Sequence, residues 1–532
     1  MVAEQEKQTP IRVASTAPLA LGNQRIKRRI GWFEGGLFNV GMIIGVGIFS
    51  NPTLILRYGG STGISLVLWI IGGLVAAAGL WAFTELGTTI PRSGGEKEYL
   101  AYAYPKPKKL LSYLFAVNGL IILRGAGIAN TLIVFGNYLN YAIYGPTYSS
   151  DYGARAWALA ALTIIAAINI LSVPLAIRLN TVVTSYKIIL VTFVVLVGFA
   201  AIVGAFPNAN IPGLVANLTF ADTSNAPSNY ANAIYYVRHA YNRTYAYNGW
   251  ANVNYILDEV HEPVKNLPKA AIFSLSTTTA LYIFANLAYF AVLTKDEILN
   301  SNLTVAATFF TKTFGGTFGS NVLPGVIALS PFGLASVILY TGSRVVLETS
   351  REGLLPFADW FNYVHPKTNS PIYGILLIYV LSVIFLFAPP PGQAFSFIVS
   401  FSGYTGYLFY FFALIGIYII RRREPDLYRP IKAPLAATGL FAIFSAYQFI
   451  FTLVPPTKVT TSYPYYLPYV ISIVVLVITI GLWYLQVVVF KGLENSYNAR
   501  IAVDAEKLVA QEVFHVEVKD GNGVKGEKEE SV

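Results

Sequence analysis

The sequence has no cysteine and only four histidines among its 532 residues. Without cysteine, neither disulfide bonds nor thiolate metal sites are possible. The histidines, at positions 239, 261, 365 and 515, lie far apart and show no metal-ligand spacing. We therefore predict no metal and no cofactor. No catalytic constellation of His, Cys, Asp or Glu side chains is recognisable either, which makes an enzyme the least favoured class.

Charged residues are also scarce, at 12% of the chain against 55% hydrophobic residues. A soluble domain of this size carries about twice that share of charge. The apolar residues gather into runs of roughly twenty, the length with which a helix crosses about 30 Å of hydrocarbon. The first thirty residues are polar and basic and lack the apolar core of a cleavable signal peptide. This composition predicts an all-α membrane protein embedded in a lipid bilayer.

Breakers such as Pro105-Lys-Pro107 and Pro389-Pro-Pro391 divide the chain into helix-length apolar segments. We predict twelve transmembrane helices, at 31–56, 62–90, 110–143, 156–173, 181–205, 231–256, 270–293, 322–347, 372–388, 394–420, 434–454 and 467–490. They group into a tail (1–30), helices one to five (31–205), helices six to ten (206–421), helices eleven and twelve (422–490), and a second tail (491–532).

Lysine and arginine collect in alternate loops, as around Lys106 and Lys108 and again at Arg421–Arg423. This asymmetry places those loops, and both termini, in the cytoplasm. The net charge of +10 is therefore attributed to basic residues that set the orientation of the helices in the membrane, and no nucleic acid partner is predicted. Two N-glycosylation sequons, at Asn217 and Asn302, fall in outward-facing loops.

Two segments contain glycines where a membrane helix is expected to break. The first segment has Gly41, Gly45 and Gly47 at mid-membrane depth, and the sixth has Tyr245-Ala-Tyr-Asn-Gly-Trp250. Glycine costs about 1 kcal/mol in a helix interior and permits unwinding. An unwound stretch survives in a bilayer only where it is buried in protein or lines a cavity. The alternative is that the glycines serve close helix packing. A dinucleotide-binding loop is excluded because no βαβ unit surrounds them.

A broken helix leaves free N–H groups at one half-helix end and free carbonyls at the other. A zwitterionic amino acid matches both, because its carboxylate suits the positive end and its ammonium the negative end. The paired breaks therefore predict an amino acid binding site halfway through the membrane.

Several strings then resemble a known family. Ile44-Gly-Val-Gly-Ile-Phe-Ser-Asn-Pro52 is similar to the first-helix motif of the amino acid–polyamine–organocation superfamily. The stretch 85–99, with its Gly94-Gly-Glu-Lys97, resembles L-type amino acid transporters and fungal high-affinity methionine permeases. Further similar strings follow in order at 266–268, 286–290, 350–356 and 429–432. The resemblance implies helices one to five and six to ten as an inverted repeat around a central site.

The resemblance also implies roles for residues at the two breaks. The substrate carboxylate is expected at the amides of Val46 and Gly47, and the ammonium at the carbonyls of Ile43, Tyr245 and Asn248. Tyr245 occupies the position of the family's aromatic gate, with aromatic packing as the alternative. The complete predicted substrate site is Ile43, Ile44, Gly45, Val46, Gly47, Ile48, Tyr245, Ala246 and Asn248. Val46, Tyr245 and Asn248 depart from the family's common residues, which leaves the substrate's identity open.

Lys187 lies inside the fifth segment, where a lysine costs at least about 2.5 kcal/mol. By resemblance, its ammonium stands where sodium-coupled relatives hold sodium, between the broken first helix and hydroxyl groups of the eighth segment, with Ser336 as the expected hydroxyl. Because burial disfavours the charged form of lysine, we predict that Lys187 carries the coupling proton. The alternative is a permanently charged strut. Asp258 and Glu259, at the inner end of the sixth segment, are expected to pair with neighbouring lysines.

These observations predict a secondary active transporter for proton-coupled uptake of neutral amino acids, methionine above others, by alternating access. A sodium-independent exchanger and a nutrient-sensing receptor of the same fold are the alternatives. The L-type exchangers are disulfide-linked to a heavy chain, which a chain without cysteine cannot be. The plasma membrane is the favoured location, ahead of the vacuole.

Overall fold

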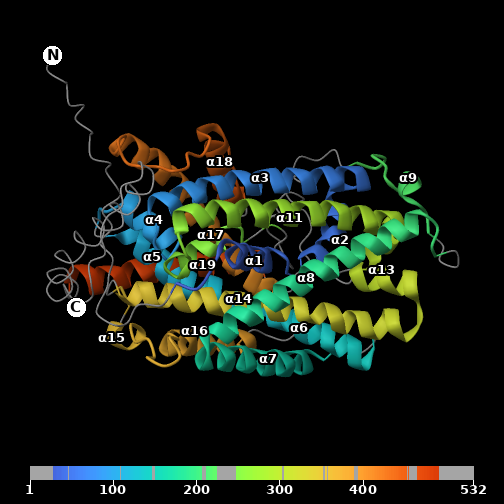
Figure 1. The fold of residues 1–532 in the computed structure, drawn as a ribbon, viewed down its shortest axis with the longest axis horizontal. Helices are drawn as coiled ribbons and strands as arrows, with labels where there is room; N and C mark the ends of the chain where they lie inside the picture. Colours follow the sequence, from blue (N-terminus) through green and yellow to red (C-terminus); the bar gives the residue numbers. More distant parts are fainter. Residues whose placement is uncertain are drawn as a thin grey trace, which may run out of the picture.

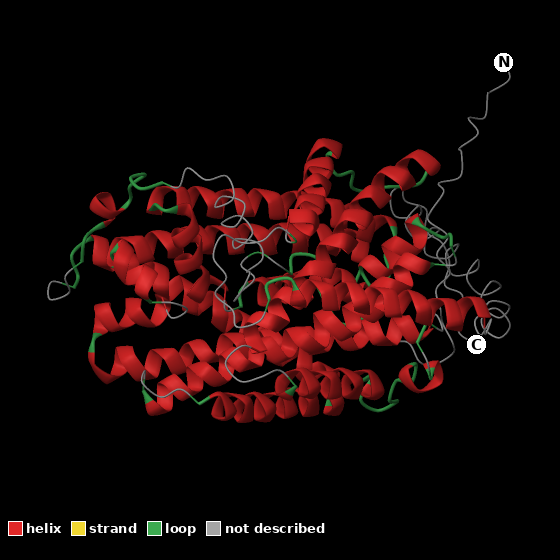
Figure 2. Cartoon of the chain, turned by 180° about the vertical axis from the view of Figure 1, so that it is seen from behind, coloured by secondary structure: helices red, strands yellow, loops and turns green. Residues whose placement is uncertain are grey.

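The computed structural model of the protein describes residues 28–45, 47–107, 109–145, 150–206, 211–223, 247, 249–301, 305–351, 354–355, 357–388, 394–451, 453 and 464–489. Over these ranges the chain is almost entirely helical and forms no strand (Figure 2). An isolated parallel bridge joins Ile30 to Val260. The predicted all-α class is therefore confirmed for the described part of the chain.

The first half of the chain supplies long helices separated by short turns. In order these are α1 (Trp32–Ile43), α2 (Gly47–Gly59), α3 (Thr62–Thr89), α4 (Glu96–Ala103), α5 (Leu110–Asn118), the π-helical η1 (Gly119–Ala126), α6 (Gly127–Tyr144), α7 (Asp151–Leu171), α8 (Val173–Ile202) and α9 (Leu214–Asn217).

The second half continues after a turn at residues 247 and 249–251. Its elements are the 3₁₀ helix η2 (Asn252–Glu259), α11 (Pro263–Val292), α12 (Lys295–Asn300), α13 (Val305–Phe314), the π-helical η3 (Phe318–Val322), α14 (Leu323–Arg351), α15 (Ala358–Phe361), α16 (Ile372–Phe387), α17 (Ala394–Arg423), α18 (Leu435–Phe451), α19 (Leu467–Trp483) and the π-helical η4 (Tyr484–Val489).

Seven helical stretches of the described chain are long and apolar enough to cross a membrane. They are 62–89, 151–171, 173–202, 263–292, 318–351, 404–423 and 467–489, and two shorter apolar helices cover 372–387 and 435–447. Large apolar side chains on their outer faces are exposed, as at Leu74 (67%) and Leu440 (68%). A helix that is apolar on its inner and outer faces alike is typical of a bilayer, where lipid covers the outer face.

Over the described residues, each predicted apolar segment other than the first and the sixth coincides largely with continuous helix, and the first is helical on both sides of residues 44–46. Of the sixth, residues 224–246 and 248 lie outside the described ranges, and the rest is a turn followed by η2. The third segment is not a uniform α-helix, because it passes through the π-helical η1. That local widening was not visible in the apolar pattern, since periodicity alone does not separate π from α turns.

The short helix α1 lies in the interior of the array, where it packs against α8, α11 and α14 (Figure 1). Its residues from Gly35 to Val40 are buried on all sides. The long helices α3 and α11 run side by side along the molecule (Figure 1). An interrupted helix at this central position is surrounded by protein, as backbone that leaves the helical path in a membrane requires.

Candidate functional site

The interruption predicted in the first segment is present. α1 ends at Ile43, Ile44 and Gly45 leave the helical path, and α2 begins at Gly47. Ile44 has φ −75° and ψ 87°, and its N–H still donates to the carbonyl of Val40 at 2.7 Å. Val46 lies outside the described ranges. The turn removes the intrahelical donors that the last carbonyls of α1 would otherwise meet.

Side chains from three other helices donate to the carbonyls at this break. Lys187 of α8 donates to the carbonyl of Gly41 at 2.8 Å. Tyr282 of α11 donates to that of Ile43 at 2.8 Å, and Ser330 of α14 to that of Gly45 at 3.0 Å. Because a buried carbonyl without a donor is costly, these three contacts fix the shape of the break.

The sixth segment approaches the same point. Gly249 has φ +107°, and a Cβ added there would lie 2.6 Å from the Cβ of Met42 and closer still to its Cγ. The side chain of Asn39 in α1 accepts from the N–H of Val253 at 2.8 Å. The backbone of the sixth segment thus lies directly against α1, next to its break. Glycine is required at position 249 both by the dihedral angle and by this close approach.

Of the predicted substrate residues, Ile43, Ile44, Gly45, Gly47 and Ile48 are buried at the break. Tyr245, Ala246 and Asn248 lie outside the described ranges, so the predicted gate does too. Tyr247 and Gly249, which flank Asn248, are close to α1 and α11. The two glycine-containing stretches therefore converge, as the sequence predicts.

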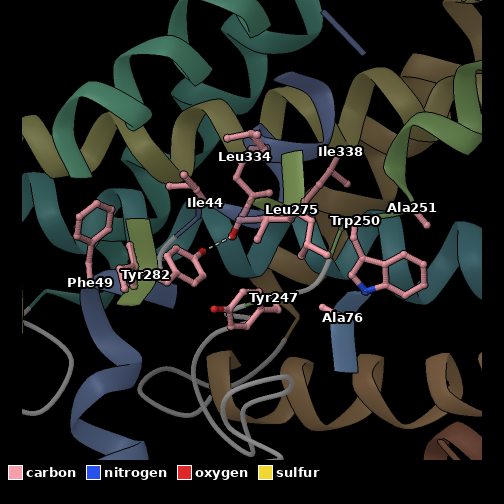
Figure 3. Packing of buried hydrophobic residues seen from close by; sticks show 14 of the residues in the cluster. Ile44, Phe49, Ala76, Tyr247, Trp250, Ala251, Leu275, Tyr282, Leu334 and Ile338 are labelled. Atoms are coloured by element: carbon pink, nitrogen blue, oxygen red, sulfur yellow. Dashed lines mark hydrogen bonds between the residues drawn. The ribbon is translucent and has the colours of Figure 1, made fainter. Parts of the chain in front are cut away.

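Three aromatic residues that the sequence analysis did not single out as site residues lie beside the break. The rings of Trp69 (α3), Tyr247 and Tyr282 (α11) contact one another, with centroids 5.1 to 5.9 Å apart. Figure 3 shows Tyr282 near Ile44, with its hydroxyl directed at the backbone, and Tyr247 beside Tyr282. Trp69 and Tyr282 belong to apolar helices in which aromatic residues are common, so no sequence signal distinguished them.

Lys187 is completely buried on the face of α8 that meets α1 and α14. A Cβ at Gly333 of α14 would lie 3.1 Å from its Cε. The predicted bond to Ser336 is not formed, because the hydroxyl of Ser336 has no hydrogen-bond partner. The hydroxyl donor of α14 at the break is Ser330, almost two helical turns away, and the partner of Lys187 is the backbone of α1.

The pairing predicted for Glu259 is wrong. Its carboxylate binds Arg344 of α14, at 2.7 Å, and among the described residues it pairs with no lysine. The sequence prediction looked for partners nearby in the chain, whereas Arg344 is 85 residues away. Within the described residues, no group of three or more His, Asp or Glu side chains could hold a metal ion.

The described geometry is an interrupted first segment packed against the turn at residues 249–251, and comparison with known proteins gives the family. Residues 30–479 match the family model described as amino acid permease. The chain is 31% identical to the high-affinity methionine permease of Saccharomyces cerevisiae, over 81% of this chain and 74% of that one. It is 30% identical to the large neutral amino acids transporter small subunit 2 of Mus musculus (81% and 77%). It is 31% identical to the mouse b(0,+)-type amino acid transporter 1 (79% and 82%).

The chain belongs to the amino acid permease family. It is therefore a multi-pass membrane transporter and not an enzyme.

Proposed function

We propose that the protein is a secondary active transporter that takes up neutral amino acids with protons by alternating access. The observation that carries the proposal is the break between α1 and α2, whose carbonyls accept from Lys187, Tyr282 and Ser330 beside Gly249. This arrangement presents opposite backbone dipole ends at one buried point, as recognition of a zwitterion requires.

The substrate's carboxylate is assigned to the start of α2, at the amides of Val46 and Gly47. Its ammonium is assigned to the carbonyls of Ile43, Tyr245 and Asn248, and Tyr245 to the gate. The carbonyl of Ile43 accepts from the hydroxyl of Tyr282 at 2.8 Å and from the N–H of Gly45 at 2.9 Å, so the substrate's ammonium would take the place of one of these two donors. Family membership supports these assignments, since the first relatives named above are transporters of amino acids.

A neutral side chain is proposed because apolar and aromatic groups border the break. Leu334 lies 2.6 Å from where a Cβ of Gly45 would be, and Trp69, Tyr247 and Tyr282 are packed alongside. The likeness to the methionine permease makes methionine the first candidate. A competition screen of the twenty amino acids against labelled methionine in transport-deficient cells tests this. Displacement by acidic or basic amino acids alone would contradict the assignment.

Lys187 is proposed as the proton carrier. Its ammonium is completely buried and bound to the carbonyl of Gly41, so losing its proton alters the end of α1 directly. Because arginine stays charged in proteins, replacing Lys187 by arginine distinguishes a proton carrier from a permanently charged structural group. If Lys187 carries the proton, Lys187→Arg abolishes proton-driven accumulation and retains exchange of substrate across the membrane. If it is a strut, Lys187→Arg retains both.

The decisive measurement is uptake under an imposed pH gradient. We expect Lys187→Ala to lose accumulation, whereas Lys295→Ala, which removes a lysine paired with Asp222 outside the membrane segments, behaves as the unmodified protein. Unchanged, fully proton-dependent uptake in Lys187→Ala would end the proposal of coupling. Transport that requires substrate on both sides of the membrane would instead identify the exchanger.

Topology and location belong to the same proposal. The charge asymmetry and the family resemblance support twelve membrane crossings, a five-plus-five inverted repeat and cytoplasmic termini. The absence of cysteine supports function without a disulfide-linked heavy chain. The plasma membrane is the proposed location.

A further inference from the structure

A buried ion pair joins the inner end of the sixth segment to α14. The carboxylate of Glu259, at the end of η2, accepts from Nε of Arg344 at 2.7 Å and from the hydroxyl of Tyr340 at 2.6 Å. Both charged side chains are about 98–99% buried. The guanidinium of Arg344 also lies 3.7 Å from the centre of the Tyr340 ring. Both carboxylate oxygens are thus bound by α14.

The backbone of Glu259 holds a different partner, the start of the first segment. Its carbonyl accepts from the N–H groups of Arg29 and Ile30 at 2.8 and 2.9 Å, and the N–H of His261 donates to the carbonyl of Ile30 at 2.9 Å. Further along, Val253 donates to Asn39 in α1. Backbone hydrogen bonds and an internal side chain therefore join α1 and η2 into one unit, which we call the α1–η2 unit.

The α1–η2 unit contacts α14 through side chains. Beside the ion pair, the ring of Phe38 packs on that of Tyr340 with centroids 5.0 Å apart, and Val337 lies 3.3 Å from where a Cβ of Gly41 would be. Attraction within a buried ion pair is largely offset by the cost of removing both ions from water. When water enters between the helices and hydrates both ions, this desolvation cost is recovered, so the ion pair can break and re-form.

We propose that Glu259, Arg344 and Tyr340 form a latch that closes the substrate site toward the side where α1 begins. Release of the latch separates the α1–η2 unit from α14 and opens the site on that side. The inference rests on the proposed alternating-access function, in which the two broken segments border the substrate. Arg344 acts as a positioning residue, through Glu259, and is not expected to touch substrate.

The effect of breaking the pair has a predictable sign. In Arg344→Gln, the carboxylate of Glu259 is left buried without a countercharge in the closed state, whereas in the open state it meets water. An uncompensated buried charge is strongly unfavourable, so the closed state loses population to the open one. Fewer molecules then present the site to the opposite side, which raises the apparent KM for substrate there.

Because the chain has no cysteine, a single introduced one reports opening directly. Val337→Cys is suited to this, since Val337 is completely buried between α1 and α14. The experiment uses the full chain in proteoliposomes and a membrane-impermeant maleimide on the side where α1 begins. We expect modification to be at least ~10-fold faster with Arg344→Gln than without it, which corresponds to a shift by one decade in the opening equilibrium. Tyr340→Phe removes one bond of the latch and should give a smaller, severalfold acceleration.

Arg421→Gln is the matched control, because Arg421 also binds a buried carboxylate, that of Glu85, but joins α3 to α17. It should leave the labelling rate of Val337→Cys unchanged. If Arg344→Gln does not fold, Tyr340→Phe decides alone. Labelling at the unmodified rate in folded protein that still transports, with either latch variant, would overturn the latch. Absence of amino acid transport by the protein with an intact latch would instead refute the proposed function.

Discussion

Gly249 provides the sharpest test of the convergence of the two broken segments. Replacing it by alanine imposes two penalties. An L-residue at φ +107° costs at least the roughly 1–2 kcal/mol of the left-handed region. The added methyl group would lie 2.6 Å from the Cβ of Met42, and overpacking of this kind costs about 1–3 kcal/mol.

Together these terms amount to about 2–5 kcal/mol against the native contact of the sixth segment with α1. At 1.4 kcal/mol per decade, the ratio of molecules with an intact contact to molecules without it falls at least ~30-fold. We therefore expect uptake per folded molecule at low substrate concentration to fall severalfold in Gly249→Ala, because only molecules with the intact contact bind substrate.

The chain offers a matched control in Gly204, after the end of α8. It also has a positive φ, of +83°, but nothing lies within 4 Å of its added Cβ. Gly204→Ala incurs only the free-energy cost of the positive φ angle and is remote from the break, so uptake per folded molecule should be unchanged. The assay is labelled amino acid uptake in proteoliposomes, normalised to the monodisperse protein recovered. Uptake by Gly249→Ala within threefold of that by Gly204→Ala would refute the placement of Gly249 against α1.

Two further predictions concern structural roles. Nδ2 of Asn217 donates to the carbonyls of Phe290 and Leu293 at the end of α11, at 2.7 and 2.5 Å. We therefore expect this sequon to remain unglycosylated when the protein is expressed in a eukaryotic secretory pathway. A glycosidase-sensitive mobility shift that is lost in Asn217→Gln would contradict this expectation. Glu85 of α3 accepts two hydrogen bonds from Arg421 and one from the N–H of Ala433, and because breaking a buried pair costs about 3–5 kcal/mol, Glu85→Ala should clearly lower the thermal unfolding midpoint. Lys265→Ala, which removes an exposed pair with Glu262, should change it little, since surface pairs contribute about 0–1 kcal/mol; equal midpoints for the two variants would contradict the role of Glu85.

Some features of the site follow from local sequence. The interruption of the first segment at Gly45 was predictable because glycine lowers the cost of leaving the helix and does so wherever it stands. Lys187 was recognisable as exceptional because a lysine within an apolar run is costly in any fold. Tyr245 and Asn248 remain predictions, since they lie outside the described ranges.

Other features depend on partners that are far apart in the chain. Tyr282 reaches Ile43 across 239 positions and Ser330 reaches Gly45 across 285. No periodicity of α11 or α14 marks these two hydroxyl groups among many others. Ser336 illustrates the limit, because its residue type suited the expected role of partner to Lys187, but the rotation of α14 brings Ser330 to the break instead.

The sequence by itself determined that the chain consists of apolar helices and that one of them breaks at Gly45, because apolar length and glycine content act locally. The tertiary structure alone decided which donors satisfy the carbonyls of the break and which arginine pairs with Glu259. Those choices depend on the rotation and depth at which whole helices pack, and packing is set by many weak contacts distributed over the entire fold.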